Sequence, residues 1–172
     1  HQIDKTALTI TDVVFIIAPR INAAGRIKHG NYAVELLTET DFDTAVKFAL
    51  EIEKNNTERK DLDKSITLEA TQQLEENNET ENFSTVVFSE TWHKGVIGIV
   101  ASRLIETYYK PTLVFTKSGD KLAASARSVQ GFDVYEALEQ CSEFIEQFGG
   151  HKYTAGLTLT EENYPKFKTK FE

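Results

Sequence analysis

The sequence predicts an α/β fold, in which a mixed β-sheet is flanked by helices and preceded by a long connector helix. Two observations carry this prediction. Apolar residues recur at helical spacing between residues 41 and 78, and no glycine or proline interrupts them. Beyond residue 80, short β-branched runs alternate with helical patterns, an order typical of α/β layers.

The first 40 residues contain one predicted strand and one predicted helix. The apolar run Val13–Ile17 has the composition of a buried strand, which Pro19 would close, and the turn-forming segment Asn22–Arg26 follows. A short helix is expected over Asn31–Thr38. We therefore assign residues 1–40 to a segment of their own.

The long helix is predicted for Asp41–Asn78, with Asp41 as its N-cap. At about 1.5 Å per residue it would reach on the order of 55 Å, which is longer than a compact domain needs. Its middle, Asn55–Lys60, is polar on every side. We therefore expect residues 41–80 to connect two bodies rather than to lie on one core.

Residues 81–172 are predicted to form the domain that holds the sheet. Strands and helices take turns here at the spacing of a layered fold. The strands are expected at Thr85–Ser89, Thr112–Thr116, Leu122–Ser128 and Gly156–Leu159, and the helices at Gly98–Tyr108, Val134–Phe148 and after Glu161.

The composition indicates the cellular location that we expect for the protein. The single cysteine, Cys141, cannot form an internal disulfide, and no run approaches the roughly 18 apolar residues of a membrane span. A cytoplasmic location without membrane contact is therefore expected. The sequence of 172 residues has no methionine, so we expect a piece of a longer protein.

The net charge of -8 argues at first sight against nucleic-acid binding, which needs local positive charge. The acidity is confined to one segment, however. Residues 35–81 carry a balance of -9, and the remaining residues carry +1. Arginines and lysines near glycines in that remainder leave phosphate binding open.

The segment from Gly149 to Gly156 is the first candidate phosphate site. Gly149 and Gly150 are predicted to lie in a turn between a helix and a strand, where successive backbone amides can form an anion-binding nest. His151, Lys152 and Thr154 would add side-chain donors. The alternative is a glycine that ends a helix and begins an ordinary polar turn.

The segment Ala123–Ser128 is the second candidate. Strand alternation directs Ser125 and Arg127 to one face and Ser128 to the other. Small neighbours leave room beside the planar guanidinium, which suits phosphate binding. The alternative is an arginine of an edge strand that faces solvent.

Two further clusters carry positive charge. His93 precedes a helix N-terminus, which attracts anions, although Gly95 and Gly98 also fit close packing of that helix on a sheet. Asn22 lies between Arg20 and Arg26, and either arginine could hold a phosphate or pair with the acidic helix.

A metal centre is not predicted within this chain. The four histidines form no His-x-His, His-Glu-x-x-His or Asp-His-His pattern. Asp61 and Asp63 lie two residues apart on a helix and so do not share a face. Two-metal hydrolysis needs clustered carboxylates and histidines, and we expect no catalytic residue or metal ligand here.

Taken in order, these clusters resemble the carboxyl-terminal part of the RecJ family, single-strand-specific DNA exonucleases of the DHH phosphoesterase superfamily. The resemblance covers about Val13 to Leu159. The matching residues are Pro19–Arg26, Asn55 with Arg59, Trp92–Leu104, Ser125–Ser128 and Gly149–Gly156.

The resemblance implies a nuclease of two lobes that acts in DNA repair and recombination. A DHH domain that binds manganese or magnesium would hydrolyse single-stranded DNA from its 5′ end. Residues 1–40 would end that domain, residues 41–80 would be the connector, and residues 81–172 would be the DHH-associated substrate-binding domain. The chain would then grip DNA and contact its own DHH domain, but would be inactive alone.

The resemblance also assigns roles to residues. Ser125, Arg127 and Arg26 would hold the 5′ phosphate or the first phosphates, and Gly149–His151 would face the metals. The full set of expected phosphate-binding residues comprises Asn22, Arg26, His93, Ser125, Arg127, Ser128, Gly149, Gly150, His151, Lys152 and Thr154.

Two other functions remain open from the sequence. One is a related module of a small-nucleotide phosphodiesterase or of the editing region of alanyl-tRNA synthetase, which shares the glycine-rich motif. The other is a partner-docking module, in which the glycines serve turns and the acidic helix meets another protein.

Overall fold

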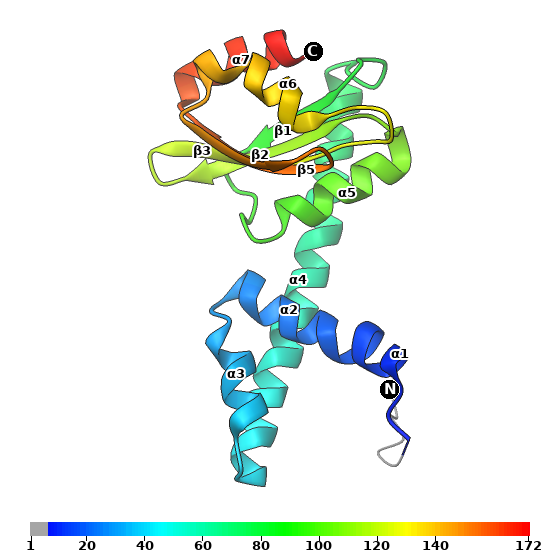
Figure 1. Cartoon of the computed structure of the whole chain (residues 1–172), viewed down its shortest axis with the longest axis vertical. Helices are drawn as coiled ribbons and strands as arrows, with labels where there is room; N and C mark the ends of the chain where they lie inside the picture. The colour runs from blue at the N-terminus through cyan, green and yellow to red at the C-terminus, as the bar shows by residue number, and fades with distance from the viewer. Residues whose placement is uncertain (1–6) are drawn as a thin grey trace. The chain divides into compact units, whose positions relative to one another are not determined.

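The computed structural model describes residues 7–172 and divides into two compact units (Figure 1). The first unit ends at Leu62 and the second runs from Asp63 to Glu172. Helix α4, Phe42–Glu76, passes through this boundary without a break. The prediction of a long helix is therefore confirmed. Residues 1–6 of the segment assigned to 1–40 lie outside the described residues.

The first unit is helical. Its elements before α4 are α1 (Ile10–Asp12), a π-helical turn (Val13–Ile17), α2 (Ala18–Ile27) and α3 (Asn31–Thr38). The helix predicted for Asn31–Thr38 is present. A small core joins α2, α3 and α4 through Ala24, Ala33 and Ile52.

The predictions of a strand at Val13–Ile17 and of a turn at Asn22–Arg26 are wrong. Both segments are helical, and Pro19 lies directly after the π-helical turn, inside one helical stretch that runs from Ile10 to Ile27. A β-branched run gains its strand preference from packing beside other strands. All strands in the described part of the chain belong to the sheet of the second unit, so this run has no neighbour with which to pair.

The second unit is built on a five-stranded mixed sheet of order β1-β2-β3-β5-β4. Only the β1–β2 pair is parallel. The predicted mixed α/β fold is therefore confirmed. The strands are β1 (Thr85–Ser89), β2 (Thr112–Ser118), β3 (Lys121–Arg127), β4 (Gln147–His151) and β5 (Thr154–Leu159).

Helices cover the two faces of this sheet unequally. Helix α5, Ile97–Tyr108, packs on β2 and β3 from one side. Helices α6 (Val134–Gln140) and α7 (Tyr164–Phe171) lie on the other side, as Figure 1 shows. The main core forms there, and its largest members include Phe115 and Phe167.

The helix predicted for Val134–Phe148 is too long. Helix α6 ends at Gln140, a 3₁₀ turn follows at Ser142–Phe144, and β4 begins at Gln147. Phe144, Ile145 and Phe148 all pack against the core, although none of them is in an α-helix. Apolar spacing therefore could not distinguish a longer helix from a turn and a strand.

The segment Gly149–His151 is consequently the end of an edge strand, not a turn after a helix. It pairs with Thr154–Gly156 in an antiparallel hairpin, whose turn is Lys152 and Tyr153. Successive amides of a strand point in opposite directions. The predicted nest of consecutive amides and the alternative helix cap are both wrong.

Side chains of α4 form hydrogen bonds to the sheet and an ion pair with α5. The amide of Gln73 donates to the carbonyl of Phe88 (2.9 Å) and accepts from its N–H (3.1 Å), so it takes the place of a neighbouring strand beside edge strand β1. Asp63 is buried and pairs with Arg103 of α5 at 3.2 Å, whereas Asp61 is exposed. None of the described helices is long and apolar enough to cross a membrane.

Candidate nucleic-acid interface

Strands β3, β5 and β4 share a face beside α5 that is exposed at Gly149 of β4 and Gly156 of β5. Residues that lie opposite one another in a sheet point to the same face, so strand register decides which side chains meet. Neighbouring strands are about 4.8 Å apart, and a row across all three therefore spans about 10 Å. The three rows are Arg127, Thr154 and His151; Ser125, Gly156 and Gly149; and Ala123, Thr158 and Gln147.

Arg127 is the centre of a hydrogen-bonded cluster on this surface. Its Nη1 donates to Ser125 Oγ (2.9 Å), to Thr154 Oγ1 (2.8 Å) and to the carbonyl of Ala126 (2.8 Å). The predicted sharing of one face by Ser125 and Arg127 is confirmed by these contacts. A guanidinium held in this way, next to two hydroxyls, presents donors suited to a phosphate.

Two glycines keep the surface open. A Cβ added at Gly149 would meet no atom within 4 Å, and at Gly156 the nearest would be the Ala124 carbonyl oxygen at 3.7 Å. Both glycines line a cavity of about 300 Å³ that also reaches Lys94 and Thr158. Their absent side chains thus leave room for a ligand instead of serving the fold.

Gly150 has a different reason to be glycine. Its φ is +149°, and a Cβ there would lie 2.3 Å from the Thr154 carbonyl oxygen and 2.5 Å from Ala155 Cα. Close approach of the two hairpin strands therefore excludes any side chain. This glycine shapes the strand on which Gly149 and His151 lie.

The turn before α5 contributes polar groups near the same end of the helix. His93 Nδ1 accepts a hydrogen bond from the Gly95 N–H (3.1 Å), which organises the turn. Lys94 Nζ donates to Ser118 Oγ (3.0 Å) and lines the cavity with Gly149. The N-cap residue Val96 offers no side-chain hydrogen bond, so an anion would find the helix terminus uncapped by a side chain.

Not every predicted site residue joins this surface. Ser128 donates to the carbonyl of Phe132 (2.8 Å), and Lys152 lies in the hairpin turn over the Tyr153 ring. Asn22 and Arg26 belong to α2 in the first unit, where both are exposed.

Arg20 and Arg26 are placed differently within the first unit. Arg20 is bound to Glu53 and donates to the Ile16 carbonyl (2.7 Å), so its charge is offset inside the unit. The hydrogen bond from Arg20 lowers the pKa of Glu53. Arg26 is exposed near the C-terminal end of α2.

Sequence reasoning missed Gln147 and Thr158 as lining residues of the surface, and it gave Gly98 only a packing role. Once β4 is known to be a strand, alternation from Gly149 and Gly156 identifies Gln147 and Thr158. The contact of Gly98 with β3 depends on helix placement, which no local pattern encodes.

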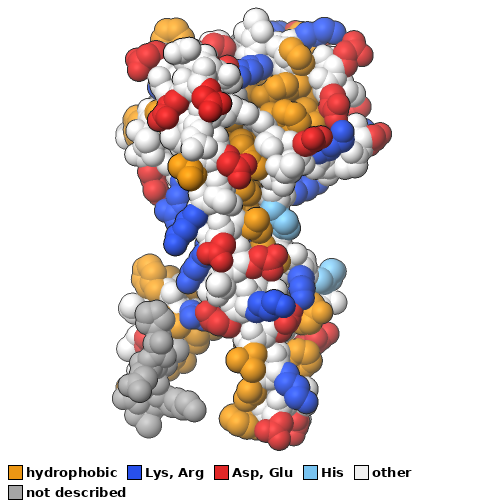
Figure 2. Space-filling view, turned by 180° about the vertical axis from the view of Figure 1, so that it is seen from behind, with side chains coloured by type: hydrophobic (Ala, Val, Ile, Leu, Met, Phe, Trp, Pro, Cys, Tyr) orange, Lys and Arg blue, Asp and Glu red, His pale blue; other side chains and the backbone are white. Residues whose placement is uncertain are grey.

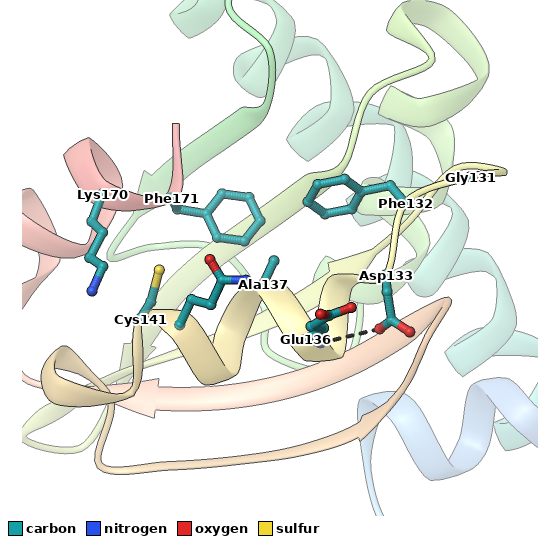
Figure 3. Close-up of a pocket in the computed structure, with 9 residues that line it drawn as sticks. Gly131, Phe132, Asp133, Glu136, Ala137, Cys141, Lys170 and Phe171 are labelled. Carbon is teal, nitrogen blue, oxygen red and sulfur yellow. Dashed lines mark hydrogen bonds between the residues drawn. The ribbon is translucent and has the colours of Figure 1, made fainter.

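A second cavity, of about 360 Å³, lies between α6 and α7 on the other side of the sheet. Figure 3 shows Phe132 and Phe171 facing each other across it, with Asp133 and Glu136 at one end. Lys170 at the other end is paired with Glu143 at 2.5 Å. Two carboxylates and an ion-paired lysine make this cavity less suited to a phosphate than the open surface of the sheet is.

Among residues 7–172, no group of three or more His, Cys, Asp or Glu side chains is arranged to hold a metal ion.

Comparison with protein families identifies the class of domain. The model of the DHHA1 domain matches residues 81–172, which is just over half of the chain. The chain therefore belongs to the DHHA1 domain family.

More of the chain is similar to RecJ proteins. The single-stranded-DNA-specific exonuclease RecJ of Bacillus subtilis is 38% identical over 160 residues, which cover 92% of this chain and 20% of that protein. The crystal structure of Thermus thermophilus RecJ with Mg²⁺ matches with a TM-score of 0.82 at 31% identity, over 94% of this chain and 25% of that one. An exonuclease RecJ bound to manganese gives 0.83 at 30% identity, over 95% and 40%. The chain thus spans well under half the length of these relatives.

Proposed function

We propose that this chain is the substrate-gripping part of a single-strand-specific DNA exonuclease of the RecJ type. The cluster of Arg127, Ser125 and Thr154, on a sheet surface floored by Gly149 and Gly156, carries the proposal. In that role it serves hydrolysis from the 5′ end during DNA repair and recombination in the cytoplasm. RecJ relatives that match nearly the whole chain support this assignment.

The chemistry of the cluster favours the terminal phosphate. A 5′-terminal phosphate carries a second ionisation near pH 6, so at neutral pH it bears more charge than a phosphodiester. Hydrogen bonds between a guanidinium and such an oxyanion are charge-assisted and strong. Arg127 with Ser125 therefore prefers a phosphorylated 5′ end, and His151 and Lys94 lie where following phosphates can pass.

Hydrolysis itself is assigned to a DHH domain outside this chain. The described residues lack a metal-binding cluster, and similar proteins have been solved with Mg²⁺ or manganese. The role of this chain is to bind and orient the strand, and we expect no nuclease activity from it alone. Gly149–His151 would face the metals of that domain.

The surface of the first unit supports a partner domain. Large hydrophobic side chains are exposed there, as Figure 2 shows, and an exposed apolar patch of this kind marks an interface. We assign this surface to contact with the protein's own DHH domain. The exposed side chains include Phe15 (73%), Leu37 (68%), Phe42 (76%) and Leu50 (66%).

The proposal is tested by fluorescence anisotropy with a 3′-labelled single-stranded oligonucleotide that carries a 5′ phosphate. Loss of a hydrogen bond to a charged group is worth about 1.5–3 kcal/mol, so Arg127→Ala should weaken binding by about 10- to 100-fold. Lys166→Ala is the matched control, because it removes one positive charge from α7 on the other side of the sheet. Equal affinities of Arg127→Ala and the parent chain would reject the assignment.

A competition arm separates the proposal from the small-nucleotide alternative. An unlabelled single strand should displace the probe at lower concentration than a cyclic dinucleotide does. Stronger displacement by the dinucleotide would assign the same surface to a small-nucleotide phosphodiesterase. Absence of binding at low salt would favour the partner-docking alternative.

A further inference from the structure

Gly98, the second residue of α5, lies directly beneath the side chains proposed to hold phosphate. A Cβ added at Gly98 would be 2.8 Å from Arg127 Nη2 and 2.9 Å from Ser125 Oγ. Real Cβ atoms do not approach other heavy atoms this closely. A side chain at position 98 and the observed positions of Arg127 and Ser125 therefore exclude each other.

The neighbours of this missing Cβ belong to the site rather than to the scaffold. Its third nearest heavy atom, at 3.6 Å, is Arg127 Cζ, so all three come from the same two side chains. A larger residue at Gly98 can therefore be accommodated if Arg127 and Ser125 move. Alanine is also the better helix former, so nothing in α5 itself requires glycine here.

Gly98 thus differs from Gly150, which is also closely packed. At Gly150 the two nearest atoms belong to the backbone of β5 and cannot move independently of the sheet. At Gly98 they are the Arg127 guanidinium and the Ser125 hydroxyl, which can be displaced by side-chain rotation. Gly150 is required by the fold, and Gly98 by the position of the ligand-binding groups.

We infer that Gly98 is a positioning residue for the terminal phosphate. On one side, Arg127 Nη1 is fixed by Ser125, Thr154 and the Ala126 carbonyl. On the other side, the bare Cα of Gly98 lets Nη2 settle against the first turn of α5. The arginine therefore presents its donors in one orientation, which sets the preference for a phosphorylated 5′ end. This inference rests on the proposed function.

Gly98→Ala separates binding from folding, and the readout is the ratio of affinities for 5′-phosphorylated and 5′-hydroxyl oligonucleotides. We expect the ratio to fall on the order of tenfold, the loss of one charge-assisted hydrogen bond. The thermal midpoint should stay at or above that of the parent, because alanine favours the helix. Gly30→Ala is the matched control, since a Cβ at Gly30 meets nothing within 4 Å, and it should leave the ratio unchanged.

The outcomes distinguish this inference from the proposed function. If Arg127→Ala abolishes the ratio and Gly98→Ala preserves it, the positioning role is rejected and the phosphate site stands. If neither substitution changes the ratio, the phosphate site itself is rejected. If the affinity ratio of Gly98→Ala falls only together with a clear drop in thermal midpoint, Gly98 has a packing role, and the inference is also overturned.

Discussion

Alanine substitutions at the two adjacent glycines of β4 should change the free energy of unfolding by different amounts. Gly150→Ala places a Cβ 2.3 Å from the Thr154 carbonyl oxygen, at a φ of +149° that side chains rarely adopt. Backbone strain of this kind costs about 1–3 kcal/mol, before any shift of β5 is counted. Gly149→Ala meets no atom within 4 Å and should change the free energy of unfolding by less than about 1 kcal/mol.

Urea unfolding followed by Trp92 fluorescence measures this difference. Trp92 is the single tryptophan, is 5% exposed, and donates to Glu69 at 2.8 Å, so it reports on the second unit. For a loss of about 2 kcal/mol and a urea m-value of about 1–3 kcal/mol/M, the urea midpoint of Gly150→Ala should fall by roughly 0.7–2 M. Equal stability of the two variants would refute the hairpin register described for β4 and β5.

The same pair also separates fold from binding. Gly149→Ala projects a methyl group into the open surface, so it should weaken oligonucleotide binding while the chain stays folded. Unchanged binding by a folded Gly149→Ala chain would contradict a ligand path over this glycine.

Two further predictions concern the rest of the second unit. Arg103→Met removes the ion pair with the buried carboxylate of Asp63, and because Arg103 is itself 52% exposed the cost should be about 1–3 kcal/mol, measured as a lower urea midpoint. The double variant with Asp63→Asn should recover part of the loss, and no recovery would contradict a direct coupling. Burial raises the pKa of the Cys141 thiol, so at pH 8 less thiolate forms than on a free cysteine and a thiol reagent should react slowly until the chain unfolds. A native reaction as fast as that of free cysteine would contradict this burial.

Much of the second unit could be predicted from local sequence. Strand β1 was predicted at the observed residues, and β2, β3 and α5 were correct to within two residues at each end. Apolar residues recur in these elements at a clear helical or strand period, and the residues that this period assigns to the core are buried. The failures occurred where tertiary contacts override local preference. Val13–Ile17 lacks a neighbouring strand, and Gln147–His151 forms a strand because it pairs with β5.

The candidate site was predictable in part for the same reason. Alternation along one strand placed Ser125 and Arg127 together, which needs no tertiary information. The contact of Arg127 with Thr154 depends on the register between β3 and β5. The closeness of Gly98 depends on how α5 packs across the sheet. Register and packing are set by the whole domain, so these partners could not be read from their own segments.

We propose that Arg127 receives the terminal phosphate of a single strand. A thermodynamic cycle measures this interaction, with the parent chain and Arg127→Ala each titrated with 5′-phosphorylated and 5′-hydroxyl forms of one oligonucleotide at fixed salt. We expect a coupling of about 1.5–3 kcal/mol between the arginine and the phosphate. A coupling near zero, with both strands weakened equally by Arg127→Ala, would show that Arg127 does not bind the terminal phosphate.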